Sequence, residues 1–235
     1  MYSGRVETLP CSLKQFVFAD INSDQSFQVF AGGNEGYNEV WWFYCSGNST
    51  TIDKYVIYNY LEQTWYNGNL TRTSWLDNHL RAYPMATDYS TTYTSGNLIY
   101  HEDGVDDGSV NPALPITSYI KSADFDIGDG DHFSYVWRIV PDVTFDGSTG
   151  AAPVVNMTMR PRQNPGAAYG NTDNPTVVSG NNYTNQRTFP VQQFTQYAYV
   201  RVRGRQMSLQ ISSNTLGTQW QLGSPRLDTR ADGRR

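Results

Sequence analysis

The longest apolar and aromatic stretch of the chain runs from Asn38 to Leu70 and reads NEVWWFYCSGNSTTIDKYVIYNYLEQTWYNGNL. Residues 40–45 are apolar without interruption, and residues 55–61 carry apolar side chains on both alternating faces. A strand that is apolar on both faces must be covered on both faces. The joins GNSTT and LEQT are too short for crossover helices, so the neighbouring strands are predicted to be antiparallel.

Small antiparallel sheets that stack face to face are typical of β-propeller blades. Trp41 and Trp42 point to opposite faces of the predicted strand, so we expect both to be largely buried and Trp65 to pack near them. Upstream, the segments QFVFADIN and SFQVFAGG predict two short strands with Gly32-Gly33 as a turn. The chain has room for at most two blades before its pattern changes.

From Phe133 onward the pattern is that of a β-sandwich, with alternating strands separated by turn-rich segments. In YAYVRVRGRQMSLQIS, Val200 and Val202 share one face while Arg201 and Arg203 share the other. After Gly204 the apolar side chains move from even to odd positions, to Met207, Leu209 and Ile211, which predicts a bulge or tight turn there. The sequence therefore predicts an all-β chain, with partial β-propeller blades in residues 1–115 and a β-sandwich-like region in residues 116–235.

Composition supports this fold class and narrows the setting. Twenty Gly, eleven Pro and a charged fraction of 17% disfavour long helices. Met1 is not followed by a basic and then apolar segment, and no apolar run approaches the roughly 20 residues that span a bilayer. We therefore expect no signal peptide and no membrane insertion. Cys11 and Cys45 lack metal-ligand spacing and are interpreted as free thiols.

Charge is distributed unevenly along the chain. Residues 1–150 hold 7 Lys+Arg and 19 Asp+Glu, whereas residues 151–235 hold 10 and 3. This asymmetry fits nucleic-acid contact by the basic part, pairing of acidic and basic faces between subunits, or plain solvation.

Two acidic clusters are candidate sites. Counted from Asp124, a calcium loop would need an oxygen ligand at its fifth position and Glu at its twelfth, but the chain has Gly128 and Tyr135 there. A polar turn is therefore favoured over a metal site. The members of this cluster are Asp124, Asp126, Asp129, Asp131 and His132.

The second acidic cluster lies on a Gly- and Pro-rich loop and consists of His101, Glu102, Asp103, Asp106 and Asp107. Glycosidase-type acid/base chemistry needs two carboxyl groups held a fixed distance apart across a cleft. Carboxylates crowded on one loop do not supply that separation by themselves, so a solvated loop is favoured. The remaining histidine, His79, is interpreted as a surface residue.

Arginines give the strongest charge signal of the C-terminal region. Beside Tyr197 and Tyr199, they could contact phosphates and stack on bases, or they could form ion pairs in a protein interface. Subunit contacts are favoured because the first part of the chain is acidic. The arginines are Arg201, Arg203, Arg205, Arg226, Arg230, Arg234 and Arg235.

The aromatic stretch from Asn38, the VDDGS loop, IKSADFDIGDG and the closing WQLGSPRLDTRADGRR together resemble the C-terminal part of a tail-protein family of short-tailed bacteriophages. This family is described as tail nozzle, tail tubular protein B or packaged-DNA stabilisation protein. The resemblance covers the chain from about residue 13. Members of the family are usually several times longer, so the chain corresponds to a C-terminal fragment or a split gene product.

The resemblance implies a non-enzymatic virion structural protein with no catalytic, cofactor or metal residues. It also implies a hexameric ring below the portal, contact with the tail adaptor and tail fibre or other tail proteins, and transient contact with genome DNA in the channel. The protein would be made in the host bacterial cytoplasm and reside in the virion tail. An alternative is a glycan-binding or carbohydrate-active β protein, in which Trp65 or Trp75 would face a cleft with two carboxylates.

Overall fold

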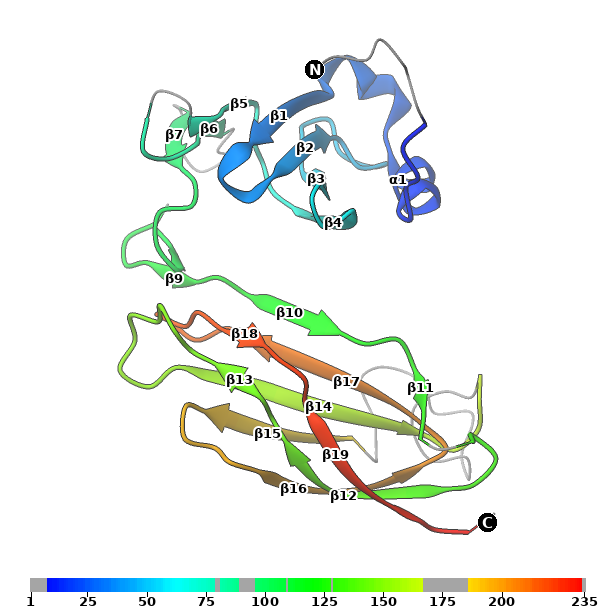
Figure 1. Cartoon of the computed structure of the whole chain (residues 1–235). Coiled ribbons are helices and arrows are strands. Elements are labelled where there is room, and N and C mark those ends of the chain that lie inside the picture. Colours follow the sequence, from blue (N-terminus) through cyan, green and yellow to red (C-terminus); the bar gives the residue numbers. More distant parts are fainter. Residues whose placement is uncertain are drawn as a thin grey trace. The chain divides into compact units, whose positions relative to one another are not determined.

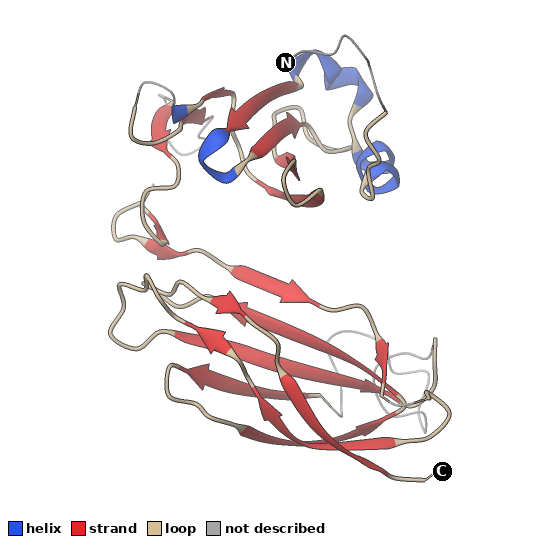
Figure 2. Ribbon diagram, viewed as in Figure 1, coloured by secondary structure: helices blue, strands red, loops and turns tan. Residues whose placement is uncertain are grey.

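The computed structural model describes residues 8–78, 81–88, 96–108, 110–127, 129–166 and 186–233. Strands make up most of the regular structure and helices are short (Figure 2), which confirms the all-β prediction. None of the described helices is long and apolar enough to cross a bilayer. The chain divides into two compact units, residues 1–103 and 104–235. The sequence placed this division later, after residue 115.

The described residues of the first unit include two antiparallel sheets and several short helical segments (Figure 1). The helical segments include α1 (Lys14–Asp20), η1 (Ser23–Gln28) and η2 (Glu35–Tyr37). The four-stranded sheet has the order β1 (Phe30–Asn34), β2 (Glu39–Tyr44), β3 (Lys54–Asn59) and β4 (Thr64–Asn69). The three-stranded sheet has the order β5 (Ser74–Leu76), β6 (Met85–Asp88) and β7 (Asn97–Tyr100).

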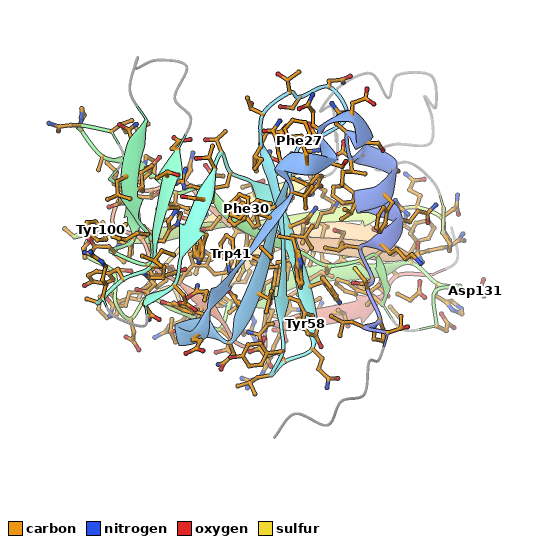
Figure 3. All side chains as sticks on the ribbon, turned by 90° about the horizontal axis from the view of Figure 1, so that it is seen from above. Phe27, Phe30, Trp41, Tyr58, Tyr100 and Asp131 are labelled. Carbon is orange, nitrogen blue, oxygen red and sulfur yellow. The ribbon has the colours of Figure 1, made fainter. Side chains whose placement is uncertain are left out.

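The core of this unit lies on one face of the four-stranded sheet. Trp41 and Phe43 of β2 are buried there, and the ring of Trp75 from β5 stacks 5.1 Å from that of Trp41. Phe30 lies close to Trp41 on the same sheet (Figure 3), with its ring 4.8 Å from that of Phe43. The two sheets therefore pack through aromatic rings. Their identification as propeller blades stays a prediction.

The opposite face of β2 is covered less completely. Trp42 stacks on Trp65 of β4 at 5.9 Å, as expected from the sequence, and Tyr58 lies 4.7 Å from Trp65. Trp41 is buried as predicted, but Trp42 is only half-buried. The ring neighbours of Trp42 come from its own sheet, and rings of the same sheet shield one another less fully than a second sheet would.

The segment before the four-stranded sheet differs from the two strands that the sequence predicted. Residues 14–20 form α1, because a weak strand propensity in so short a segment is readily overridden by its surroundings. Gly32 and Gly33 lie inside β1 rather than in a turn. A Cβ atom at Gly32 would sit 2.4 Å from the Trp75 ring, so glycine is needed there for the close approach of β5.

The second unit is a two-layered β structure preceded by a small hairpin (Figure 1). The hairpin consists of β8 (Asp106–Asp107) and β9 (Leu114–Pro115). One layer has the order β10 (Ser118–Lys121), β17 (Gln206–Ser213), β14 (Val154–Arg162) and β15 (Arg187–Gln192), with β11 (Phe125–Asp126) also paired to β17. The other has the order β16 (Ala198–Gly204), β12 (Ser134–Val140) and β19 (Arg226–Ala231). A small ribbon joins β13 (Val143–Thr144) to β18 (Gln221–Leu222).

Both layers contribute to one apolar core. Val136 of β12 and Val202 of β16 pack against Met157 of β14 and Met207 of β17, and all four side chains are buried. The alternation predicted for residues 198–203 is confirmed, since Val202 points into this core and Arg201 is exposed.

Gly204 marks the point where the chain leaves one layer for the other. The shift of the apolar side chains from even to odd positions, which the sequence shows there, corresponds to this crossing, after which β17 joins the β14 sheet. A Cβ at Gly204 would lie 2.8 Å from the carbonyl oxygen of Arg162, and Arg205 N–H donates to that same oxygen at 2.9 Å. The crossing therefore requires a residue without a side chain.

Candidate functional site: an arginine and aromatic face

The outward side of the β16–β12–β19 sheet carries the arginine signal of the sequence. Because Val200 and Val202 of β16 point into the core, Tyr199, Arg201 and Arg203 of the same strand point outward. We call this surface the arginine face. Its members are Tyr135, Trp137, Arg138, Tyr197, Tyr199, Arg201, Arg203, Arg226, Asp228 and Arg230.

A β-bulge adds two residues that sequence reasoning missed. On β12, Val136 and Ile139 are both fully buried although they are three positions apart. The register with both neighbouring strands shifts between Val136 and Arg138, so that Trp137 and Arg138 both point away from the core. Arg201, on β16 beside this shift, has a φ of +54°, a left-handed conformation that bulges often contain.

Aromatic rings and guanidinium groups interleave on this face. The rings of Trp137 and Tyr199 stack 6.0 Å apart, and Tyr197 meets Tyr199 edge-on at 5.6 Å. The Arg138 guanidinium lies 4.8 Å from the Trp137 ring centre, and that of Arg230 lies 5.6 Å from the same ring. These are cation–π distances, so the rings hold the guanidinium groups in defined positions.

Two aspartates partly neutralise the positive charge. Arg138 pairs with Asp228 on the neighbouring strand, and Arg203 pairs with Asp232 while lying 4.0 Å over the Phe133 ring. These internal partners lie 90 and 29 positions away along the chain, so the sequence pattern did not reveal them.

Three further arginines have no acidic partner among the described residues. They are Arg201, Arg226 and Arg230, and all three are exposed. The face therefore keeps a positive surplus beside exposed tyrosine rings. Such a surface can bind carboxylates of another protein through forked hydrogen bonds, or phosphates with stacked bases. Arg234 and Arg235 lie outside the described residues.

The acidic cluster before β12 is held by internal contacts. Asp124 forms an ion pair of 2.8 Å with Arg162, and Asp126 accepts a hydrogen bond of 2.9 Å from the side chain of Gln206. Both contacts join the segment of residues 124–126 to the sheet of β14 and β17. Within the described part of the chain, no three His, Cys, Asp or Glu side chains are placed to hold a metal ion.

The rest of that cluster forms a turn. The carboxylate of Asp129 accepts the backbone N–H groups of Asp131 and His132 at 3.1 and 3.2 Å, and it lies 2.9 Å from Nδ1 of His132. Hydrogen bonds from the backbone and then the side chain of His132 lower the pKa of Asp129. The geometry is that of a polar turn, which is the interpretation that the sequence favoured.

His101, from the second predicted cluster, is engaged within the first unit. Its Nε2 accepts a hydrogen bond of 2.8 Å from Nε of the buried Arg72, and its ring packs 4.7 Å from that of Trp75. Burial, and then the charge of Arg72, lower the pKa of His101 to about 4. His101 is therefore neutral at pH 7 and serves as the acceptor for a buried arginine. His79 lies outside the described residues.

Two carboxylates that follow His101 are each hydrogen-bonded within their own unit. Glu102 accepts a hydrogen bond of 3.1 Å from the side chain of Asn34 in the first unit. Asp106, in the second unit, accepts the backbone N–H of Gly217 at 2.8 Å. The structure thus gives these two residues separate partners rather than gathering the loop into one cluster.

The two tryptophans considered for sugar binding are engaged by the protein itself. Trp75 packs in the core and its Nε1 donates to the carbonyl oxygen of Gly33 at 2.6 Å. Trp65 stacks on Trp42, and its Nε1 donates to the carbonyl oxygen of Pro10 at 2.9 Å. Neither indole N–H is therefore available to a sugar hydroxyl without breaking an internal hydrogen bond.

Comparison with protein-family models gave no match, and comparison with curated proteins gave none either.

Proposed function

We propose that the chain is a virion structural protein of a short-tailed phage, forming part of the tail nozzle that retains and conducts the genome. Its work would be assembly and containment rather than catalysis. The resemblance of the aromatic stretch and the C-terminal segments to that tail-protein family supports this proposal. A fold of two β units joined in one chain is compatible with it.

The observation that carries the proposal is an exposed apolar sheet face in the first unit. On the side of β5–β6–β7 opposite Trp75, Leu76 is 55% exposed, Leu98 62% and Tyr100 53%. The buried Met85 lies between Leu76 and Tyr100 on the same face, and exposed apolar side chains grouped in this way are typical of a surface that a neighbouring subunit covers. A component of a ring or tail would bury it on assembly.

The arginine face would serve the same assembly as a contact surface. An acidic region of a tail adaptor, tail fibre or other tail protein would pair with Arg201 and Arg226. If these arginines instead line a channel, they would contact genome DNA transiently.

A locating experiment tests the proposal. Antibody raised against the purified chain should label the tail of intact phage particles in electron microscopy, and the purified chain should form a ring, six copies being expected, by light scattering. Particles that lack the chain would refute the virion assignment.

A binding experiment separates the two uses of the arginine face. If DNA contact is its role, Arg201→Glu should lower the slope of log affinity against log salt by about one unit for each phosphate contact removed. Unchanged DNA affinity together with impaired assembly would assign the face to protein contacts.

A further inference from the structure

A second surface, on the first unit, has the opposite character to the arginine face. It is an open depression of about 590 Å³ between η2 and the strands β2, β3 and β4. Tyrosines, asparagines and two glutamates make up most of its wall. We call it the acidic depression, and its lining includes Tyr37, Asn38, Glu39, Tyr55, Glu62 and Tyr66.

Glu39 and Glu62 line this depression, and Glu102 adjoins it through Asn34 and Tyr37. Glu39 accepts a hydrogen bond of 3.0 Å from Nε1 of Trp41, and Glu102 accepts one from Asn34. Burial, with contributions from Glu102 and Glu62, raises the pKa of Glu39, and burial also raises the pKa of Glu102. Within the described part of the chain, none of the three glutamates forms an ion pair.

A buried amide beside these carboxylates is incompletely satisfied. Asn34 is 0% exposed, and its Nδ2 donates to Glu102 while its Oδ1 has no hydrogen-bond partner. That oxygen lies near Gly36, a residue of the depression wall, 3.9 Å from where a Cβ on Gly36 would lie. Buried polar groups are normally paired, so Asn34 is an incompletely satisfied group beside Glu102.

The tyrosines around the carboxylates complete the chemistry of a cation site. The rings of Tyr37 and Tyr66 are half-exposed, and Tyr55 stacks 4.9 Å from Trp41. Aromatic faces attract guanidinium and ammonium groups, and an arginine brings several N–H donors that carboxylates accept. A hydrated point charge such as Lys would use the rings less well than a planar guanidinium.

Each copy of the chain carries both the acidic depression and a set of arginines that lack an acidic partner. We propose that the acidic depression of one copy receives arginine side chains from the arginine face of a second copy. The contact is heterologous, because two different surfaces meet, and it can therefore propagate from copy to copy. This contact would join neighbouring copies in the assembly proposed above. The inference rests on the proposed function only in assuming that the chain assembles with copies of itself.

Charge reversal on either side tests this contact by sedimentation velocity of the full chain. Glu62→Lys changes an exposed side chain of the depression, and Arg201→Glu with Arg226→Glu changes two arginines without internal partners. Each variant should weaken self-association roughly 30-fold or more, the usual loss when one side of a charged contact is removed. Asp24→Lys and Arg187→Glu, at exposed positions outside both surfaces, should associate like the wild type.

Mixing the two variants gives the decisive result. The arginine face of the Glu62→Lys chain and the depression of the Arg201→Glu/Arg226→Glu chain are both intact, so the mixture should form a 1:1 dimer that grows no further. A chain that carries all three changes should regain association. The dimer and the regained association would support the contact.

Three outcomes would overturn it. They are a wild-type chain that stays monomeric, variants that associate normally, and a Glu62→Lys chain that loses binding to an oligosaccharide array but not to other copies. The last would reassign the depression to glycans. None of them decides whether the chain is present in phage tails, which the labelling experiment measures separately.

Discussion

The hydrogen bond from Arg72 to His101 makes the first unit sensitive to acid. In the folded chain the pKa of His101 is about 4, because the ring is buried and adjoins a guanidinium, whereas an unfolded histidine titrates near its ordinary 6.5. Between these values the unfolded state binds a proton that the folded state does not. The stability of the first unit should therefore fall as the pH is lowered from about 6.5 toward 4.

The size of this effect follows from the two pKa values. At pH 5 an unfolded histidine is almost fully protonated, which stabilises the unfolded state by about 2 kcal/mol. Partial solvent access to the ring reduces the figure to about 1–2 kcal/mol. His101→Gln keeps an acceptor for Arg72 and cannot be protonated, so the variant should lack this part of the acid sensitivity.

Urea unfolding followed by the fluorescence of the stacked tryptophans measures the difference. Between pH 7.5 and pH 5, the free energy of unfolding of the wild type should fall by about 1–2 kcal/mol more than that of His101→Gln. The other titratable groups are the same in both chains, so their contributions cancel when the two chains are compared. His132→Gln, at a partly exposed site in the second unit, is the matched control and should leave the first unit unchanged. Parallel curves for wild type and His101→Gln would refute the assignment of His101 as a neutral acceptor.

Two core changes test the second unit. Met157→Ala removes a fully buried side chain from between the layers and should lower the free energy of unfolding by about 2–5 kcal/mol, measured by chemical denaturation. A loss below about 1 kcal/mol would mean that the site is not close-packed. Gly204→Ala places a methyl group 2.8 Å from the carbonyl oxygen of Arg162. The free energy of unfolding should therefore fall by about 1–3 kcal/mol, and the melting temperature should drop. An unchanged melting temperature would contradict the close crossing between layers.

Local pattern was enough to predict the strands that carry strong alternation or continuous apolar runs. The strands at residues 39–44 and 54–59 and the outward side of Arg201 follow directly from such patterns. The same reasoning failed where a pattern was short, as in residues 14–20, which form a helix. There the surroundings decide the conformation, and a few aromatic residues do not specify it.

The candidate surfaces depend on contacts that no local pattern contains. Trp137 joins the arginine face through a bulge, whose only sequence sign is the three-residue spacing of Val136 and Ile139. Glu39 and Glu102 come together through Asn34 although they lie on distant segments. Sequence reasoning found Tyr197 and Tyr199 beside the C-terminal arginines, but it missed Trp137 and did not find the acidic depression.

The positions of β10 and β19 determine how the second unit responds to tension. Ser118 begins β10 opposite Ser213, and Ala231 ends β19 opposite Ser134, at the other end of the strands (Figure 1). A pull applied at these two points runs parallel to the strands, and the hydrogen bonds between antiparallel strands lie across that direction. Those between β10 and β17 would share the force together instead of opening one after another. The sandwich is thus built to resist stretching along its length far better than peeling from either edge.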